Sequence, residues 1–367
     1  MRFPGFEGEW ARCTLGEIGE PYIGLTYSPA DVVNEGGTIV FRSSNIQNGE
    51  IDYSDIVRVN KKIKDSIITR KDDLLICARN GSPRLIGKNA LLKDADAGQT
   101  FGAFMLVFRS NDNHFVHQLL STKGYYSQVS ENLGARINQI TTSNIKDFEF
   151  YFPKSIAERN KIADFLNLID ERISIQNKVI EKYESLIKAI TRCLVHCNGH
   201  QCFLGDIAEI YQPKTITGLE MSNGGQYPVF GANGIIGHYK DYNHASPQIC
   251  IACRGNTCGV LNYSLPFSWI TGNSMVINVD SSSSGVNKRF LFHLLSTVDY
   301  SPLISGSGQP QIVRGPLQKL RITLPDKQCQ DKNAQIIDCL IEKSNVEKAL
   351  LRKLQTQKNF FLTAVFI

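Results

Sequence analysis

The residues best suited to chemistry in this sequence are cysteines and histidines that gather near its middle. They are Cys193, His196, Cys197, His200 and Cys202. Thiolate and imidazole ligands at short spacing are what a tetrahedral zinc site uses. The paired Cys-x-x-Cys spacing of a zinc finger is absent, and Cys250, Cys253 and Cys258 form a second incomplete group. We therefore favour reduced cysteines that act as small apolar side chains in a reducing compartment, and predict no metal site.

Other catalytic signatures in the sequence are incomplete. The segment Gly81–Lys88 is similar to a phosphate-binding loop, but five residues instead of four separate Gly81 from Gly87, and Asn89 stands where Ser or Thr would bind magnesium. The glycines from Gly231 to Gly237 are spaced by threes, which is not the dinucleotide fingerprint. The Asn/Asp-Pro-Pro-aromatic tetrapeptide of amino-methyltransferases and the common nuclease pattern are also missing. We expect a protein that binds without catalysing and needs no cofactor of its own.

Polar side chains with forked donors and acceptors recur in the turns of both halves of the sequence. Arginine, asparagine and glutamine match the edges of guanine and adenine in the major groove, and lysines suit phosphates. Each such residue taken singly is more often ordinary solvated surface, so the recurrence is what favours DNA recognition. The candidates are Arg42, Ser43, Asn45, Lys61, Lys62, Arg79, Asn80, Arg84, Lys88, Arg136, Asn138 and Gln139 in the first half, and Asn233, His238, Tyr239, Arg254, Asn256, Thr257, Gln309, Gln311 and Arg314 in the second.

The elements that must position these residues occur twice. Four landmarks return in the same order, and only the loops between them change length, as expected when binding loops diverge on a constant scaffold. A duplicated module predicts a duplicated target. The landmarks are Leu15–Ile18 with Leu204–Ile207, Leu74–Gly81 with Ile249–Gly255, Phe115–Thr122 with Phe290–Thr297, and Ile145–Pro153 with Leu317–Pro325.

Length and composition fit two domains with connectors. The 367 residues exceed one ordinary domain, and 42% apolar residues give each half material for a core. The net charge of +5 permits a polyanionic partner without requiring one. No apolar run approaches the ~18 residues of a membrane span, and Met1–Trp10 does not resemble a signal peptide. We therefore expect a cytoplasmic protein.

Each module is predicted to be mixed and mainly β, with short strands between turns rich in glycine, asparagine and serine. We place the modules at residues 1–153 and 198–326, and long helices at residues 154–197 and 327–367. The predicted strands are Thr38–Phe41, Leu74–Ala78, Phe104–Phe108, Ile249–Ala252 and Met275–Val279.

Both predicted helices carry a narrow apolar seam at heptad spacing. The second seam is poorer because Lys343, Glu347 and Gln357 interrupt it, and it also includes Ile336. The simplest way to bury both seams is to pack the helices on each other, antiparallel with one module at each end; alternatively, each helix packs on its own module. The seam residues are Ile162, Leu166, Ile169, Ile173, Ile180, Tyr183 and Ile187, then Leu340, Leu350, Leu354 and Phe361.

Over essentially its whole length, the chain resembles the specificity subunit of type I restriction-modification systems. The resemblance lies in the order of several motifs, which occurs twice. They are Trp10–Ile18, Arg42–Ile46, Tyr227–Gly237, Thr271–Ser274, and the exits into long helices at Pro153 and Pro325. It implies an α+β fold with two target recognition domains, held apart by two antiparallel helices packed as a coiled coil, with internal pseudo-twofold symmetry. The poorer second seam leaves open whether the C-terminal end packs on the N-terminal segment.

The resemblance also implies a division of labour with other proteins. Each recognition domain would read one half of a split, asymmetric sequence in double-stranded DNA. Two modification subunits would bring S-adenosylmethionine and methylate adenine N6, and restriction subunits would translocate and cleave the DNA. The rival interpretations are a fragment of a single-chain restriction-modification enzyme and an adaptor scaffold that does not bind DNA.

Overall fold

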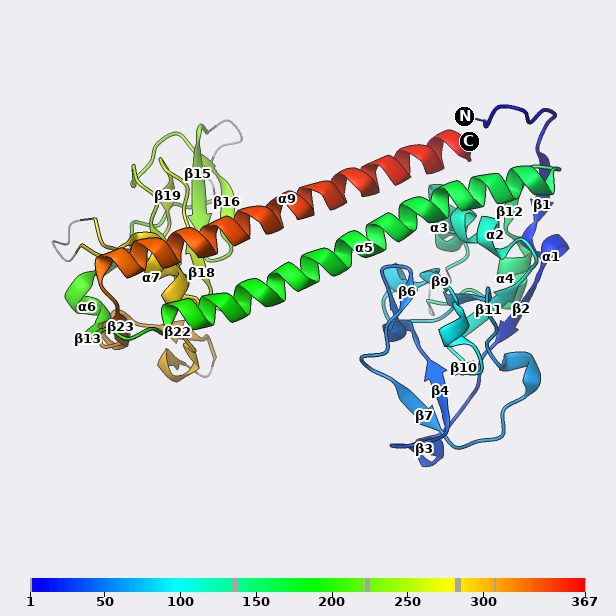
Figure 1. Cartoon of the computed structure of the whole chain (residues 1–367), viewed down its shortest axis with the longest axis horizontal. Coiled ribbons are helices and arrows are strands. Elements are labelled where there is room, and N and C mark those ends of the chain that lie inside the picture. The colour runs from blue at the N-terminus through cyan, green and yellow to red at the C-terminus, as the bar shows by residue number, and fades with distance from the viewer. Residues whose placement is uncertain are drawn as a thin grey trace. The chain divides into compact units, whose positions relative to one another are not determined.

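The computed structural model describes residues 2–133, 138–218, 220–221, 225–280, 285–306 and 308–366. The chain divides into two compact units: unit 1 is Met1–Lys178 with Ala349–Ile367, and unit 2 is Val179–Lys348. Each unit therefore holds one module together with part of each long helix, α5 (Ile156–Val195) and α9 (Lys327–Val365), which are drawn in green and in orange to red in Figure 1. Within the described ranges, no helix is both long enough and apolar enough to cross a membrane.

The core of unit 1 lies on an antiparallel sheet in the order β2-β11-β8-β9. The strand β8 is central and apolar at every position, so all four of its side chains are buried. Helix α2 follows β11, and its Phe115 and Val116 are buried in the same core. The bounds are β2 Glu20–Ile23, β8 Leu74–Cys77, β9 Asn89–Leu91, β11 Met105–Arg109 and α2 Asn113–Leu119.

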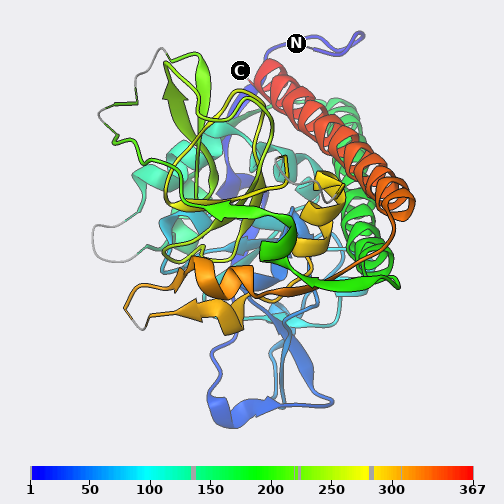
Figure 2. The same cartoon turned by 90° about the vertical axis from the view of Figure 1, so that its left-hand side faces the viewer.

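A second sheet of unit 1 has the order β10-β4-β7-β3, with β10 and β4 parallel. Its β3–β7 end, drawn in blue, projects from the rest of the unit (Figures 1 and 2). The outer strands β1 and β12 pair with each other and lead the chain into α5. The bounds are β1 Ala11–Thr14, α1 Leu15–Ile18, β3 Val32–Val33, β4 Thr38–Phe41, β5 Ile46–Gln47, β6 Glu50–Ile51, β7 Val57–Val59, β10 Thr100–Phe101, α3 Lys123–Glu131, α4 Thr142–Asp147 and β12 Glu149–Phe152.

Unit 2 repeats this plan, as the duplicated landmarks predicted. Its main sheet β14-β20-β17-β18 corresponds to β2-β11-β8-β9, and the ribbon β13-β23 corresponds to β1-β12. The parallel pair β15-β19 matches β4-β10. The bounds are β13 His200–Phe203, α6 Leu204–Ile207, β14 Glu209–Tyr211, β15 Tyr227–Gly231, β16 Gly234–Tyr239, β17 Ile249–Ala252, β18 Leu261–Tyr263, β19 Trp269–Ile270, β20 Ser274–Asn278, α7 Lys288–Leu295, β21 Ile304–Ser305, β22 Gln311–Ile312, α8 Arg314–Gln318 and β23 Arg321–Leu324.

Inside unit 1, the first part of α5 packs against the last part of α9 in antiparallel fashion. The rings of Phe165 and Phe361 meet at 4.9 Å, and Lys358 Nζ lies 2.6 Å from Asp170 Oδ1. The C-terminal end does pack on the N-terminal segment, because the ring of Phe366 lies 6.2 Å from that of Trp10. The question that the sequence left open is thereby answered for this unit.

Inside unit 2, the last part of α5 packs against the first part of α9, again antiparallel. Lys348 Nζ lies 2.7 Å from Glu184 Oε1, and Asn333 Nδ2 donates to the carbonyl oxygen of Leu194 at 2.9 Å. The predicted fold class, two similar mixed modules with two long antiparallel helices, agrees with these contacts.

The predicted seam of α5 lies away from solvent. Ile162, Leu166, Ile169 and Ile180 are buried, and Ile173, Tyr183 and Ile187 are half-buried.

In α9, two of the five residues predicted for the seam, Ile336 and Leu350, lie on the exposed side. Leu350 is 42% exposed and Ile336 is 37% exposed, whereas the following residues turn inward: Ile337 is buried and Leu351 is half-buried. The sequence misleads here because the buried line includes a polar residue, Ser344. Leu354 is buried and Leu340 and Phe361 are half-buried, so these three do lie on the inner side.

Candidate nucleic-acid interface

Three separate loops meet in unit 1 and form a cluster that we call loop cluster 1, residues 42–45, 79–81 and 138–140. Asn80 Nδ2 donates to Ser43 Oγ at 3.0 Å, and the Asn80 amide donates to the Asn138 carbonyl at 3.3 Å. Asn138 Nδ2 in turn donates to the Gly81 carbonyl at 3.1 Å. The structure thus brings together predicted site residues that are up to 97 positions apart in the sequence, from Arg42 to Gln139.

The most available side chain of loop cluster 1 is Arg79. It is exposed and forms no ion pair within the described part of the chain. Its guanidinium stacks 4.9 Å from the ring centre of Phe104, whose side chain is 57% exposed. Phe104 was not among the predicted site residues because it was assigned to a strand. The strand β11 begins one residue later, at Met105, and leaves Phe104 in the preceding turn.

Two predicted DNA contacts in the same cluster are structural instead. Asn45 is 1% exposed; its Oδ1 accepts from the Arg42 amide at 2.9 Å, and its Nδ2 donates to the carbonyls of Asp52 and Asp55 at 3.0 and 2.9 Å. The Arg42 guanidinium is held by the Asp55 carboxylate at 2.8 Å. Asn45 has no free group to offer a base and Arg42 is neutralised, so both shape the loop.

The predicted phosphate contacts lie apart from loop cluster 1. Lys61 and Lys62 follow β7 beside the N-terminal end of β4, whereas the loop cluster begins at the other end of β4. Lys61 Nζ already lies 3.3 Å from Asp31 Oδ2, and Lys61 and Lys62 line a shallow hollow together with Lys64.

Three other candidates of unit 1 differ in accessibility. Lys88 is half-buried, and desolvation lowers the pKa of its ammonium group. Arg84 is exposed on a short 3-10 helix, Pro83–Leu85. Arg136 lies outside the described residues.

Unit 2 has an equivalent cluster, loop cluster 2, formed by residues 231–234, 253–257 and 309–312. The Gly255 amide donates to the Pro310 carbonyl at 2.9 Å. Ser274 Oγ donates to the Gly231 carbonyl at 3.2 Å, and Ser274 pairs with Ala252 in the sheet, so the turn of the β15–β16 hairpin lies beside the end of β17.

Most of the predicted residues of unit 2 lie in or beside loop cluster 2. Arg254, Asn256, Asn233, Gln309 and Gln311 are exposed there. Thr257 is half-buried, and Arg314 is the exposed first residue of α8, directly after this cluster.

His238 and Tyr239 do not belong to loop cluster 2. They lie at the far end of β16, four and five residues from the turn, and His238 pairs with Pro228. At about 3.4 Å per residue this places them well over 10 Å along the strand. Tyr239 packs edge to face on Trp269, with ring centres 5.1 Å apart.

Cys77, Cys250 and Cys253 are buried thiols. Burial raises the pKa of Cys77 to about 11 and that of Cys250 to about 12, which disfavours the thiolate that a metal would need. Desolvation also raises the pKa of Cys253. Among the described residues, no three His, Cys, Asp or Glu side chains are grouped as metal ligands.

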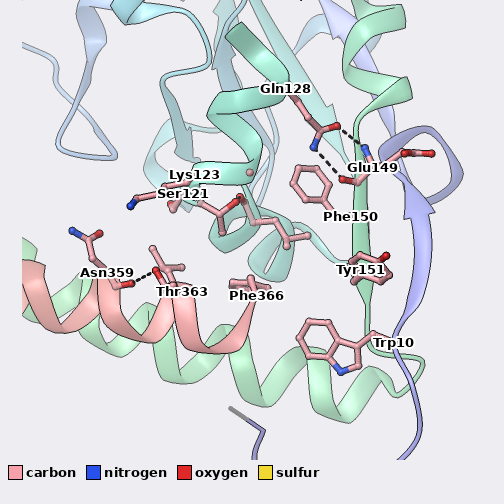
Figure 3. A pocket seen from close by; sticks show the side chains of 14 residues that line it. Trp10, Ser121, Lys123, Gln128, Glu149, Phe150, Tyr151, Asn359, Thr363 and Phe366 are labelled. Atoms are coloured by element: carbon pink, nitrogen blue, oxygen red, sulfur yellow. Dashed lines mark hydrogen bonds between the residues drawn. The ribbon is translucent and has the colours of Figure 1, made fainter. Parts of the chain in front are cut away.

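A pocket in unit 1 lies between the C-terminal turns of α9 and the α3–β12 region (Figure 3). Gln128 closes one side, since its amide donates to the Glu149 carbonyl at 3.0 Å and accepts from the Glu149 amide at 2.9 Å. Of the residues that line the pocket, Lys123 and Glu149 are the charged ones, and Arg12 pairs with Glu149. Glu149 is the one carboxylate among these lining residues, and its pairing with Arg12 engages it.

Comparison with protein families gives a match over both units. A family model described as the type I restriction modification DNA specificity domain matches residues 7–185 and 201–356. The specificity subunit of the EcoprrI type I restriction enzyme of Escherichia coli is 31% identical over 112 residues, which are 30% of this chain and 27% of that protein. The StySPI specificity subunit of Salmonella potsdam is 25% identical over 195 residues, 51% of this chain and 42% of that protein. The chain thus aligns with less than half the length of these curated relatives.

A solved structure extends the likeness of fold to the whole chain. The crystal structure of a type I restriction-modification S subunit from M. genitalium matches with a TM-score of 0.69, over 100% of this chain and 99% of that one. The sequence identity is 19%, so this likeness concerns the fold alone.

Proposed function

The chain belongs to the family of type I restriction modification DNA specificity domains, which it matches in two segments, and from this membership we propose that it directs a modification and restriction complex to a split DNA sequence. Each unit reads one half-site through its loop cluster. The observation that carries the proposal is the recurrence, at equivalent places in both units, of an exposed arginine opposite a glutamine, Arg79 with Gln139 and Arg254 with Gln311. Such side chains match base edges in the major groove.

The two half-sites differ, and the whole target is asymmetric. Loop cluster 1 offers Ser43 and Asn80 where loop cluster 2 offers Asn233 and Asn256. A palindromic target requires two identical reading surfaces, and these two have diverged.

The two long helices set the spacer between the half-sites. The 40 residues of α5 extend about 60 Å at 1.5 Å per residue. Half-sites read from one face of a duplex lie about 34 Å apart, or one turn. The antiparallel contacts between α5 and α9 inside each unit support this role.

The chain itself does not catalyse in this proposal. Two modification subunits bind it and methylate adenine N6 with S-adenosylmethionine, and restriction subunits add translocation and cleavage. If the purified chain alone transferred a methyl group from S-adenosylmethionine, the assignment as a purely recognising subunit would be wrong.

The experiment that tests the proposal is the mapping of methylated adenines in DNA from cells that carry the chain with its modification partner. We expect two unlike half-sites separated by a spacer of fixed length. Replacing residues 1–153 with the module of another family member should change one half-site and leave the other unchanged. A change in both half-sites would contradict independent reading.

A second experiment tests the ruler. Inserting one heptad into both α5 and α9 adds about 10 Å, or about three base pairs at 3.4 Å each. The mapped spacer should lengthen by that amount. An unchanged spacer would contradict the role of the helices, and DNA affinity that does not fall with salt would contradict phosphate binding altogether.

A further inference from the structure

Each unit holds one exposed arginine opposite a glutamine in the same backbone setting. In unit 1, Arg79 forms an isolated antiparallel bridge with Gln139, and in unit 2, Arg254 forms one with Gln311. Both arginines follow a central strand of the main sheet, β8 in unit 1 and β17 in unit 2. The loop clusters of the two units differ in most residues, but both contain the same bridge between an arginine and a glutamine.

The hydrogen bonds around the Arg79–Gln139 pair define its type. The Ile140 amide donates to the Ala78 carbonyl at 2.9 Å, and the Asn80 amide donates to the Asn138 carbonyl at 3.3 Å. These bonds flank the pair and leave Arg79 and Gln139 without a mutual backbone bond. In such a non-hydrogen-bonded pair the Cα atoms lie only about 4.5 Å apart and the two side chains lie side by side.

The Arg254–Gln311 pair is of the same type. The Ile312 amide donates to the Cys253 carbonyl at 3.1 Å, and the Gly255 amide donates to the Pro310 carbonyl at 2.9 Å. The identical pattern gives both units the same spacing between arginine and glutamine.

The neighbours of each pair determine which way the side chains point. Ala78 and Ile140 are buried in the core of unit 1, and Cys253 and Ile312 are buried in the core of unit 2. Side chains alternate between the two faces of an extended strand. The arginine and the glutamine of each pair therefore point together away from the core.

An adjacent arginine and glutamine have a defined complement in DNA. The guanidinium donates two parallel hydrogen bonds to O6 and N7 of guanine, and the glutamine amide donates to N7 and accepts from the N6 amino group of adenine. Bases stacked about 3.4 Å apart along one strand are close enough for side chains that start about 4.5 Å apart.

We propose that the Arg79–Gln139 and Arg254–Gln311 pairs are the base-reading centres of the two units, and that each reads a G·C pair next to an A·T pair. This proposal rests on the proposed function, because it assigns the specificity of the same surfaces. Other side chains of the loop clusters read or exclude the remaining positions and make the two half-sites different.

The test is selection of bound DNA from a randomised duplex library by the full chain together with its modification subunits. Wild-type protein should select a G·C pair next to an A·T pair in each half-site. Arg79→Ala should weaken the guanine preference at one position of one half-site by roughly 5- to 150-fold, and Arg254→Ala should do so in the other half-site. Circular dichroism should be unchanged, because both side chains are exposed.

Two further variants separate base reading from general attraction to DNA. Gln311→Glu replaces the amide donor with an acceptor and should shift the preference at the adjacent position from adenine toward cytosine, whose N4 amino group donates. Arg70→Ala removes an exposed arginine of unit 1 at the other end of β8, where it pairs with Asp65, and should leave every base preference in place.

The outcomes that overturn the inference differ from those that overturn the proposed function. A wild-type target that is split but lacks guanine in either half would refute the arginine assignment. So would uniform weakening across all sequences by Arg79→Ala, which is the signature of a phosphate contact. No selected sequence at all, or a continuous one, would instead refute the proposed split-site function.

Discussion

Replacement of Asn45 tests whether the first loop cluster is shaped by a buried amide or reads DNA with it. Asn45→Ala removes three hydrogen bonds, to the Arg42 amide at 2.9 Å and to the Asp52 and Asp55 carbonyls at 3.0 and 2.9 Å. The Asp55 carbonyl keeps one partner, because the Arg42 guanidinium also donates to it at 3.0 Å. The Arg42 amide and the Asp52 carbonyl lose theirs.

The cost follows from these contacts. A net hydrogen bond contributes about 1 kcal/mol, and a group left unsatisfied costs somewhat more, so the loop should lose about 2–3 kcal/mol. Hydrogen exchange of the amides between residues 42 and 55 should accelerate by roughly 30- to 150-fold. Ser44→Ala is the matched control, since Ser44 is exposed in the same loop, and should leave exchange unchanged.

The outcome that would refute this reasoning is specific. If Asn45→Ala leaves exchange unchanged and removes one base preference from one half-site, Asn45 reads a base as the sequence first indicated. We expect faster exchange and lower affinity for that half-site, with the sequence preference retained.

Three further predictions concern both units. Burial lowers the pKa of His117, in α2, to about 4. An unfolded histidine titrates near 6.5, so between pH 6.5 and pH 4 the unfolded chain binds more protons than the folded chain. The melting temperature of unit 1 should therefore fall from pH 6.5 to pH 4, and His117→Gln should flatten that pH dependence. Mild copper-catalysed oxidation should join Cys197 and Cys329, whose sulfurs lie 3.8 Å apart, in a disulfide detected by peptide mass; an absent cross-link would contradict the antiparallel pairing of α5 and α9 in unit 2. Phe104→Ala should weaken the guanine preference attributed to Arg79 by about 2- to 5-fold, because the stacked ring contributes about 0.5–1 kcal/mol; an unchanged preference in the same selection assay would show that the stacking has no role in reading.

The repeated plan of the fold was predictable because it rests on burial patterns. The strands predicted at Thr38–Phe41 and Ile249–Ala252 have those bounds in the structure. Continuous apolar runs of this kind identify buried strands whatever the loops do. The apolar seam of α5 could also be predicted from the sequence, since seven apolar positions fall on one side of a helix without proline or glycine.

The errors arose where a polar side chain is buried. Ser344 is buried on the inner side of α9, directly after Lys343, which was predicted to interrupt the seam. Asn45 was predicted to contact DNA because the donor and acceptor of its amide match base edges, and its hydrogen bonds to Asp52 and Asp55 depend on chain folding that no local pattern encodes. Composition reveals that a polar group exists, whereas only the fold reveals whether its partner is water, backbone or a ligand.

The two units show how one backbone position can carry different side chains beside the arginine of each loop cluster. The carbonyls of Phe104 and Asn273 accept from equivalent amides, those of Ala78 and Cys253, each at 3.0 Å. The backbone position is therefore shared, and the side chain is free to differ. In unit 1 it is a ring that holds Arg79 in place by stacking, and in unit 2 it is an exposed amide that adds a donor and an acceptor. Arg79 and Arg254 thus differ in their neighbours, and an arginine that is already ordered loses less conformational entropy when it binds a ligand. If the two arginines read DNA as proposed, divergence at this position should make the two half-sites unequal in strength.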